Sequence, residues 1–229
     1  MSAIKYQQRA PNMVKARLAI GKSTVIRWAQ TMEPRVSELV QEMDRHRERF
    51  EAFCLSLTDR ELATSIPGAP WTVHGYIAHL ATIEALINPW FGAMAGIRDI
   101  KPPEVPPGQP FDLDDWNEAI VGRRAGHTVE ELLAEAAGRR ADYVRCLSAM
   151  TSALLDSEVP FGGDRKVIDL PPVPVRLDRL LWAIGLHDPM HMQDILRALP
   201  ERERDANVRK WLGSVDYSRM PEEVAARRA

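Results

Sequence analysis

The chain has 229 residues, a formal net charge of −2 and an isoelectric point near 6.3, so its overall charge provides no drive toward nucleic acid or an anionic membrane. Hydrophobic residues make up 45% of it, enough for the core of one large domain, and no apolar run approaches the roughly 18 residues of a membrane span. Two cysteines within amphipathic runs, Cys54 and Cys146, and the lack of a secretory signal predict core thiols in a soluble, cytoplasmic protein.

Residues 1–32 are predicted to form a basic N-terminal extension. They contain six lysines and arginines and no acidic residue, whereas the remaining residues hold 24 basic and 32 acidic side chains, a net charge of −8. Such a segment is typical of an interaction tail or a transit peptide, and equally of an extension that lies against an acidic body. We favour the extension.

A long amphipathic helix is predicted over residues 34–57, where apolar residues recur at three- and four-residue intervals. His46 falls on its apolar stripe, either near a metal site or, as we favour, at the rim of the core. Thr58-Asp59-Arg60-Glu61 is a capping box that begins a short helical turn, and Pro67-Gly68-Ala69-Pro70 ends it.

A second long helix is predicted over residues 72–94, with Thr72 as its N-cap and a kink at Pro89. It is apolar nearly all round, which places it centrally in the fold. His79 lies on one of its apolar stripes. Glu84 comes five residues later and points about 140° away around the helix, so it is predicted to be a structural partner rather than a second ligand.

Proline separates the next elements. Residues 101–110 contain five prolines and are predicted to be an irregular crossover. A short helix follows over residues 112–122, and a capping box at residues 128–131 begins a third long helix that reaches Met150. Arg140 lies on its inward stripe, where it could bind an anionic group or pack its stem while its guanidinium reaches water.

The last part of the chain is predicted to hold a hairpin and the fourth long helix. The hairpin covers residues 158–167 around Gly162-Gly163, although Pro160 limits its pairing. The helix covers residues 175–199, and Pro189 should either kink it or begin a new helix with Asp188 as N-cap. Short helices are expected near residues 208–212 and 221–228.

Four long amphipathic helices joined by two long connections predict an all-α fold, a four-helix bundle. The bundle is expected over residues 33–200, between the basic extension of residues 1–32 and a charged C-terminal tail with short helices over residues 201–229. Bundle cores are a usual place for metals bound by histidine, which directs attention to the histidines on the helices.

Three histidines are the candidate metal ligands. His187 and His191 are four residues apart, so both imidazoles share one helix face. Such a pair is often two unrelated side chains on a solvated face, but these two interrupt an apolar stripe, where histidines need partners. A metal site needs at least a third protein ligand, for which His79 is the best candidate. Asp194 could orient a ligand imidazole, or be a solvated carboxylate near the helix end.

Three motifs together resemble a known family. They are Trp71 followed eight residues later by His79, Asp115-Trp116-Asn117 with Arg124 downstream, and the segment HDPMHMQDI of residues 187–195. Over roughly residues 34 to 199 the chain is similar to the DinB/YfiT-like superfamily, which includes mycothiol-dependent maleylpyruvate isomerases and bacillithiol S-transferases. The resemblance implies an up-down-down-up bundle with a divalent metal held by three histidines, which correspond to His79, His187 and His191.

The leading hypothesis is a metal-dependent enzyme that activates a low-molecular-weight thiol or water against a small electrophilic substrate, of the thiol S-transferase or isomerase type. Three neutral imidazoles leave coordination positions for water, a thiolate or a substrate oxygen, and they suit zinc, nickel or iron without choosing among them. The expected partners are the small substrate and, from the resemblance and the frequency of symmetric dimers, a second copy of the chain.

Two hypotheses from other classes stay open. One is a non-catalytic bundle that binds a metal or a small ligand, as a sensor or stress-response protein. The other is a metal-dependent phosphohydrolase of the HD type, suggested by the His187-Asp188 doublet. That class needs a further upstream histidine and a downstream aspartate in a different helical arrangement.

Overall fold

The structure, a computed structural model, describes residues 32–102, 111–162 and 172–222. The predicted basic extension lies outside the described residues except for Met32. The same holds for most of the proline-rich crossover, the centre of the predicted hairpin and most of the helix expected at residues 221–228.

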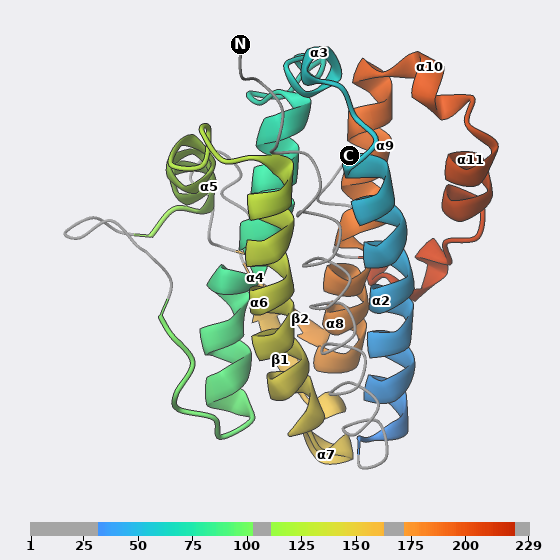
Figure 1. Cartoon of the computed structure of the whole chain (residues 1–229). Coiled ribbons are helices and arrows are strands. Elements are labelled where there is room, and N and C mark those ends of the chain that lie inside the picture. Colours follow the sequence, from blue (N-terminus) through green and yellow to red (C-terminus); the bar gives the residue numbers. More distant parts are fainter. Residues whose placement is uncertain (1–31, 103–110, 163–171, 223–229) are drawn as a thin grey trace, which may run out of the picture.

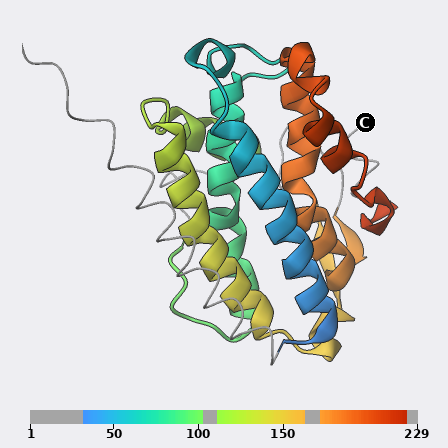
Figure 2. The same cartoon turned by 45° about the vertical axis from the view of Figure 1, so that its right-hand side comes forward.

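The described residues form an all-α bundle. Its long helices are α2 (Pro34–Cys54), α4 (Val73–Met94), α6 (Val129–Ser148) and the consecutive pair α8 (Leu177–Gly185) and α9 (His187–Ala198). Helix α2 runs upward in Figure 1, α4 and α6 run downward, and α8 and α9 run upward again. Helix α4 packs along α6 and also contacts α9, and α2 contacts α6, α8 and α9 (Figures 1 and 2). The predicted up-down-down-up four-helix bundle is therefore confirmed.

Capping residues determine where several helices begin. Thr58 and Thr128 each form the predicted capping box, with Glu61 and Glu131 respectively, at the starts of α3 (Asp59–Leu62) and α6. Thr72 accepts a hydrogen bond from the Gly75 amide at the start of α4. Helix α4 continues through Pro89 to Met94. The shorter helices are α5 (Leu113–Gly122), α7 (Ser152–Leu155), α10 (Pro200–Glu203), α11 (Ala206–Leu212) and the 3-10 helix η1 (Tyr217–Arg219).

The hairpin prediction was wrong about the second strand. Strand β1 (Glu158–Phe161) pairs antiparallel with β2 (Val173–Arg176), in a segment where prolines were expected to end the hairpin and the fourth helix to begin. Pro160 lies opposite Pro174. The Leu177 amide donates to the Ser157 carbonyl, so these two residues form a hydrogen-bonded pair. In an antiparallel ladder such pairs alternate with pairs that form no hydrogen bond, and Pro160 and Pro174 form a pair of the second kind. Neither proline is therefore required to donate an N–H to the other strand.

The fourth helix is broken, but not where the sequence suggested. Helix α8 ends at Gly185, and α9 begins at His187 with Leu186, not Asp188, as its N-cap residue. Pro189 has no N–H to donate to the Gly185 carbonyl one turn earlier, so the helical hydrogen-bond pattern is interrupted at Leu186. Because the interruption precedes His187, both histidines of the pair lie on α9 and keep their four-residue spacing.

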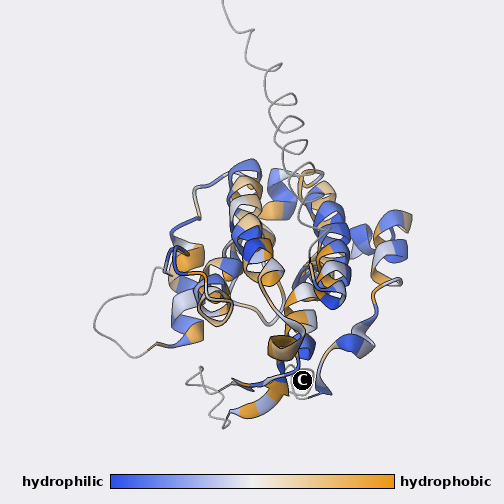
Figure 3. Ribbon diagram, turned by 90° about the horizontal axis from the view of Figure 1, so that it is seen from below, coloured by the Kyte–Doolittle hydropathy of each residue, from blue (hydrophilic) through white to orange (hydrophobic). Residues whose placement is uncertain are grey.

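The core of the described residues consists of two hydrophobic clusters. Figure 3 shows hydrophobic residues, in orange, alternating with hydrophilic ones along the helices that supply them. The lower cluster joins the first half of α2, the end of α4, the second half of α6, helix α8 and Met190 of α9; its largest members include Met43, Phe91, Tyr143 and Leu177. The upper cluster joins the end of α2, the first halves of α4 and α6 and the part of α9 that follows Met190, together with α5 and α11. Its members include Phe50, Trp116, Leu132 and Trp211. Cys54 and Cys146 are buried free thiols in these clusters, as predicted.

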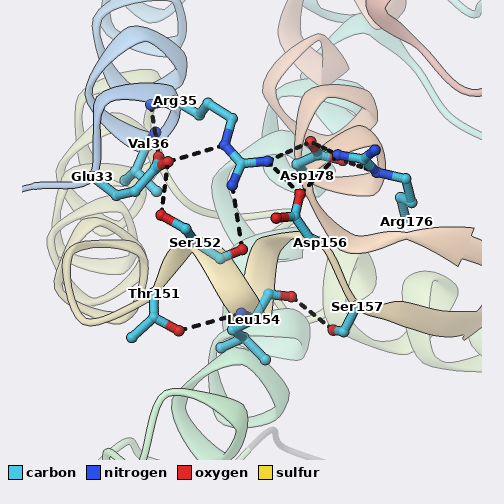
Figure 4. A network of polar contacts seen from close by, with 10 residues as sticks. All are labelled: Glu33, Arg35, Val36, Thr151, Ser152, Leu154, Asp156, Ser157, Arg176 and Asp178. Carbon is cyan, nitrogen blue, oxygen red and sulfur yellow. Dashed lines mark hydrogen bonds and ion pairs between the residues drawn. The ribbon is translucent and has the colours of Figure 1, made fainter.

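A surface network ties the start of α2 to the segment between α7 and α8 (Figure 4). The Arg35 guanidinium donates to Asp156 at 2.8 Å and to Asp178 at 3.1 Å, and Arg176 donates to the same two carboxylates. Exposed ion pairs contribute little individually to stability, so the network matters mainly as a connection of α2 to the end of α7 and the start of α8.

Candidate metal centre

The structure brings the three predicted ligands together. His79 comes from α4, His187 and His191 come from α9, and one nitrogen of each imidazole lies within 4.8 Å of the corresponding nitrogens of the other two. His79 is buried and the other two are half-buried. Within the described ranges, this is the group of histidine, cysteine and acidic side chains whose geometry could hold a metal ion. A set of neutral imidazoles suits a transition metal.

The positions of the rings follow from the helices. His187 is the first residue of α9 and His191 lies one turn later, so their Nε2 atoms are 3.2 Å apart. His79 reaches them because α4 packs against α9, and its ring centroid lies 5.3 Å from that of His187 and 5.2 Å from that of His191. The pair is therefore not two unrelated side chains on a solvated face.

Asp194 contacts the imidazole of His191, which agrees with the interpretation that it orients a candidate ligand. Its carboxylate accepts a hydrogen bond from His191 Nδ1 at 2.8 Å, and its second oxygen accepts from Arg197 at 2.7 Å. Because a carboxylate only accepts, His191 carries its proton on Nδ1, and the lone pair of a neutral ring is then on Nε2, beside His187. This is the orientation in which metal-binding histidines are commonly held.

Two aromatic residues at the start of α4 enclose the imidazoles. Trp71 stacks on His79 with ring centroids 5.2 Å apart, and Tyr76 approaches His191 edge-on at 5.2 Å. Gly75 allows this packing, because a Cβ there would lie 2.7 Å from the Trp71 Cβ. Burial raises the pKa of Tyr76, which keeps its hydroxyl protonated at neutral pH. The sequence reasoning missed Tyr76, although its spacing of three residues from His79 placed it on the same face.

Four charged residues, one from each bundle helix, lie between the two hydrophobic clusters; we call Arg47, Glu84, Arg140 and Asp188 the charge ring. Three of them are buried and Arg140 is half-buried. Arg47 makes a two-pronged contact with Asp188, at 2.8 and 3.0 Å, and Arg140 donates to Glu84 at 2.6 Å. The two pairs touch through contacts of 3.8 and 3.9 Å. Glu84 is thus a structural partner, as predicted.

Arg140 binds an anionic group, as one of the two interpretations offered for it predicted, and that group is the Glu84 carboxylate within the protein. Arg47 and Asp188 were not recognised from the sequence. The available signal was an arginine on the apolar stripe of α2, between Met43 and Phe50, where an unpaired charge would be costly.

His46 and Arg124, which the sequence analysis also named, make contacts within the fold and lie outside the three-histidine group. His46 is buried, accepts a hydrogen bond from the Trp211 indole at 3.0 Å and lies outside the three-histidine group, as favoured. Arg124 holds Glu135 of α6 with two hydrogen bonds of 2.8 and 2.7 Å and so anchors the end of α5. A cavity of about 220 Å³ beside Arg35 and Trp182 has none of the three histidines in its lining.

A sequence model described as the DinB superfamily matches residues 42–195, more than half of the chain. The chain belongs to the DinB superfamily. The part that matches this superfamily runs from α2 into α9 and contains all three histidines and the whole charge ring. No curated protein matches the chain. None of the described helices has the combination of length and apolar character that a membrane crossing requires.

Proposed function

We propose that this DinB-superfamily protein binds one divalent transition metal through His79, His187 and His191. The observation that carries the proposal is the convergence of three imidazole nitrogens within 4.8 Å from two separate helices. The hydrogen bond from His191 to Asp194 supports it, because it turns the other ring nitrogen toward the centre of the group. Zinc, nickel and iron all suit this donor set.

We further propose a catalytic role, in which the protein activates a low-molecular-weight thiol or water against a small electrophile. A bound metal would supply a Lewis acid, which polarises a carbonyl and lowers the pKa of a bound water or thiol. The chain's own residues bind the metal and hold the proton on His191 Nδ1, while Trp71 and Tyr76 shield the imidazoles from water. The resemblance to thiol-dependent isomerases and S-transferases supports this reaction class.

The cysteines of the chain favour a thiol that comes from outside. Cys54 is buried and its pKa is raised well above its usual value by burial, while burial raises the pKa of Cys146 to about 11. Since the thiolate is the reactive form, neither side chain is suited to act as the nucleophile. A thiol reaction at this site would therefore use a small thiol as its second substrate.

The position of Asp188 argues against the hypothesis of a metal-dependent phosphohydrolase. Asp188, the acidic member of the His187-Asp188 doublet, faces Arg47 and lies outside the group of candidate ligands. Its carboxylate is thus occupied within the core.

The test of metal binding is elemental analysis of protein purified without chelator. The wild type is expected to contain about one transition metal per chain, and His79→Ala is expected to lose it. His74→Ala is the matched control, because His74 lies on the same helix but bonds to the His127 carbonyl and is not one of the three. Absence of metal from the wild type after reconstitution with zinc, nickel and iron would contradict the proposal.

The test of catalysis uses the metal-loaded protein with a panel of small thiols and electrophiles. We expect turnover that His79→Ala abolishes and His74→Ala retains. Stoichiometric metal binding without turnover in this panel would instead favour the second candidate, a non-catalytic metal-binding bundle.

A further inference from the structure

We propose that Arg47 and Asp188 are positioning residues for the three-histidine site, because their buried ion pair fixes the first turn of α9, the turn that begins with His187. The part of this inference that concerns metal affinity rests on the proposed function. The part that concerns the order of the turn does not, and it can be tested on the metal-free protein.

The first turn of α9 begins at an interruption in the fourth helix. Helix α8 has ended at Gly185, Pro189 has no N–H, and Leu186 provides no side-chain hydrogen bond as a cap. The amide of Met190 donates to the Leu186 carbonyl at 3.1 Å, and this bond spans the turn. A side-chain contact that reaches this turn from another helix therefore contributes to the direction of His187.

The Arg47–Asp188 pair provides that hold. Arg47 Nε and Nη2 donate to the two different oxygens of Asp188, at 2.8 and 3.0 Å, and such a planar fork fixes the orientation of the carboxylate as well as its distance. Arg47 and Asp188 are both buried, so water has little access to the pair. Because Asp188 is the neighbour of His187 in the chain, the fork on α2 sets the rotation of the residue that carries the ligand.

The other half of the charge ring provides a matched control. Glu84 and Arg140 form a second pair at 2.6 Å, which connects α4 to α6, with a buried carboxylate and a half-buried guanidinium. That pair makes only long contacts with Arg47 and Asp188, at 3.8 and 3.9 Å, and neither of its members lies on α9. Its removal should loosen the bundle without releasing the first turn of α9.

The experiment compares two double variants that each remove one positive and one negative charge. Arg47→Met with Asp188→Asn removes the fork on α9, and Arg140→Met with Glu84→Gln removes the control pair. Keeping the net charge constant excludes a simple electrostatic effect on a cation. Two readouts are measured on each variant: the dissociation constant for Co²⁺, from its visible absorption, and the hydrogen-exchange rate of the Met190 amide in metal-free protein.

In the Arg47/Asp188 variant we expect at least a tenfold weaker affinity for Co²⁺, the usual effect of losing a residue that orients a metal ligand, and at least tenfold faster exchange at Met190. In the Arg140/Glu84 variant we expect less than a threefold change in each. Equal changes in both variants, or unchanged Met190 exchange in the first, would overturn the inference. If the wild type bound no Co²⁺, metal binding would fail, and the exchange rates would still decide whether the pair orders the turn.

Discussion

The proton on His191 is fixed by one carboxylate. Asp194 lies one turn after His191 on α9 and accepts from Nδ1, so the ring presents Nε2 to the other two imidazoles. The same carboxylate is held on its outer side by Arg197. Residues three apart on a helix are neighbours, so this arrangement could be anticipated from the sequence, although the alternative of a solvated carboxylate could not be dismissed without coordinates.

Asp194→Asn is expected to weaken metal binding by about tenfold, because the amide can present its NH₂ to Nδ1 and permit the wrong tautomer. Competition with a chromophoric chelator measures the affinity. Arg197→Ala is the control, since it removes the exposed partner of Asp194 and leaves the contact with His191; we expect less than a twofold change. An unchanged affinity in Asp194→Asn would show that the carboxylate does not orient the ligand.

Helix α8 approaches α2 closely at a single glycine. A Cβ at Gly185 would lie 2.8 Å from Leu39 Cδ1 and 3.1 Å from Met43 Cγ, and both of those side chains are fully buried. The missing side chain thus lets the two helices touch, immediately before the interruption that begins α9.

Gly185→Ala is expected to lower the free energy of unfolding by about 1–2 kcal/mol, because buried neighbours must shift to admit the methyl group. Gly138→Ala is the matched control. Gly138 lies on the exposed face of α6 with no atom within 4 Å of an added Cβ, so the variant should gain up to about 1 kcal/mol from helix propensity. Urea denaturation measures both, and a stabilised Gly185→Ala would refute the close approach.

The helices could be predicted from local sequence signals, whereas contacts between residues far apart in the chain could not. The capping boxes at Thr58 and Thr128 and the apolar periodicity placed the helices, because those signals lie within a few residues of the structure they specify. The partner of β1 was missed, because a proline that can be tolerated opposite another proline looks like a strand breaker when read alone. The Arg47–Asp188 pair joins residues 141 positions apart, and periodicity says nothing about such a pairing.

In the molecule as a whole, the C-terminal segment closes the side of the bundle. Trp211 of α11 belongs to the upper cluster and donates to Nδ1 of His46, whose Nε2 lies 3.2 Å from Glu42. An imidazole that accepts at Nδ1 must be deprotonated there, so this contact requires neutral His46. Burial lowers the pKa of His46, in agreement with that requirement.

The stability of the protein is therefore expected to fall on acidification through this histidine. Below the ordinary histidine pKa of about 6.5, unfolded chains take up a proton that the folded protein excludes, so the free energy of the unfolded state is lowered relative to that of the folded state. His46→Gln retains an acceptor for Trp211 and cannot titrate. Its unfolding free energy should change less than that of the wild type between pH 7 and pH 5, and equal slopes would contradict this role.

The charge ring at mid-height also bears on how the sequence can diverge. Substitutions that are far apart and share no partners contribute additively to stability, and the buried members of the lower and upper clusters lie on opposite sides of the ring. Substitutions at the end of the bundle that contains Met43 and Tyr143 are then expected to have little effect on the positions of His79 and its neighbours. We therefore expect substitutions in the lower cluster to change the free energy of unfolding more than they change the geometry of the three-histidine site.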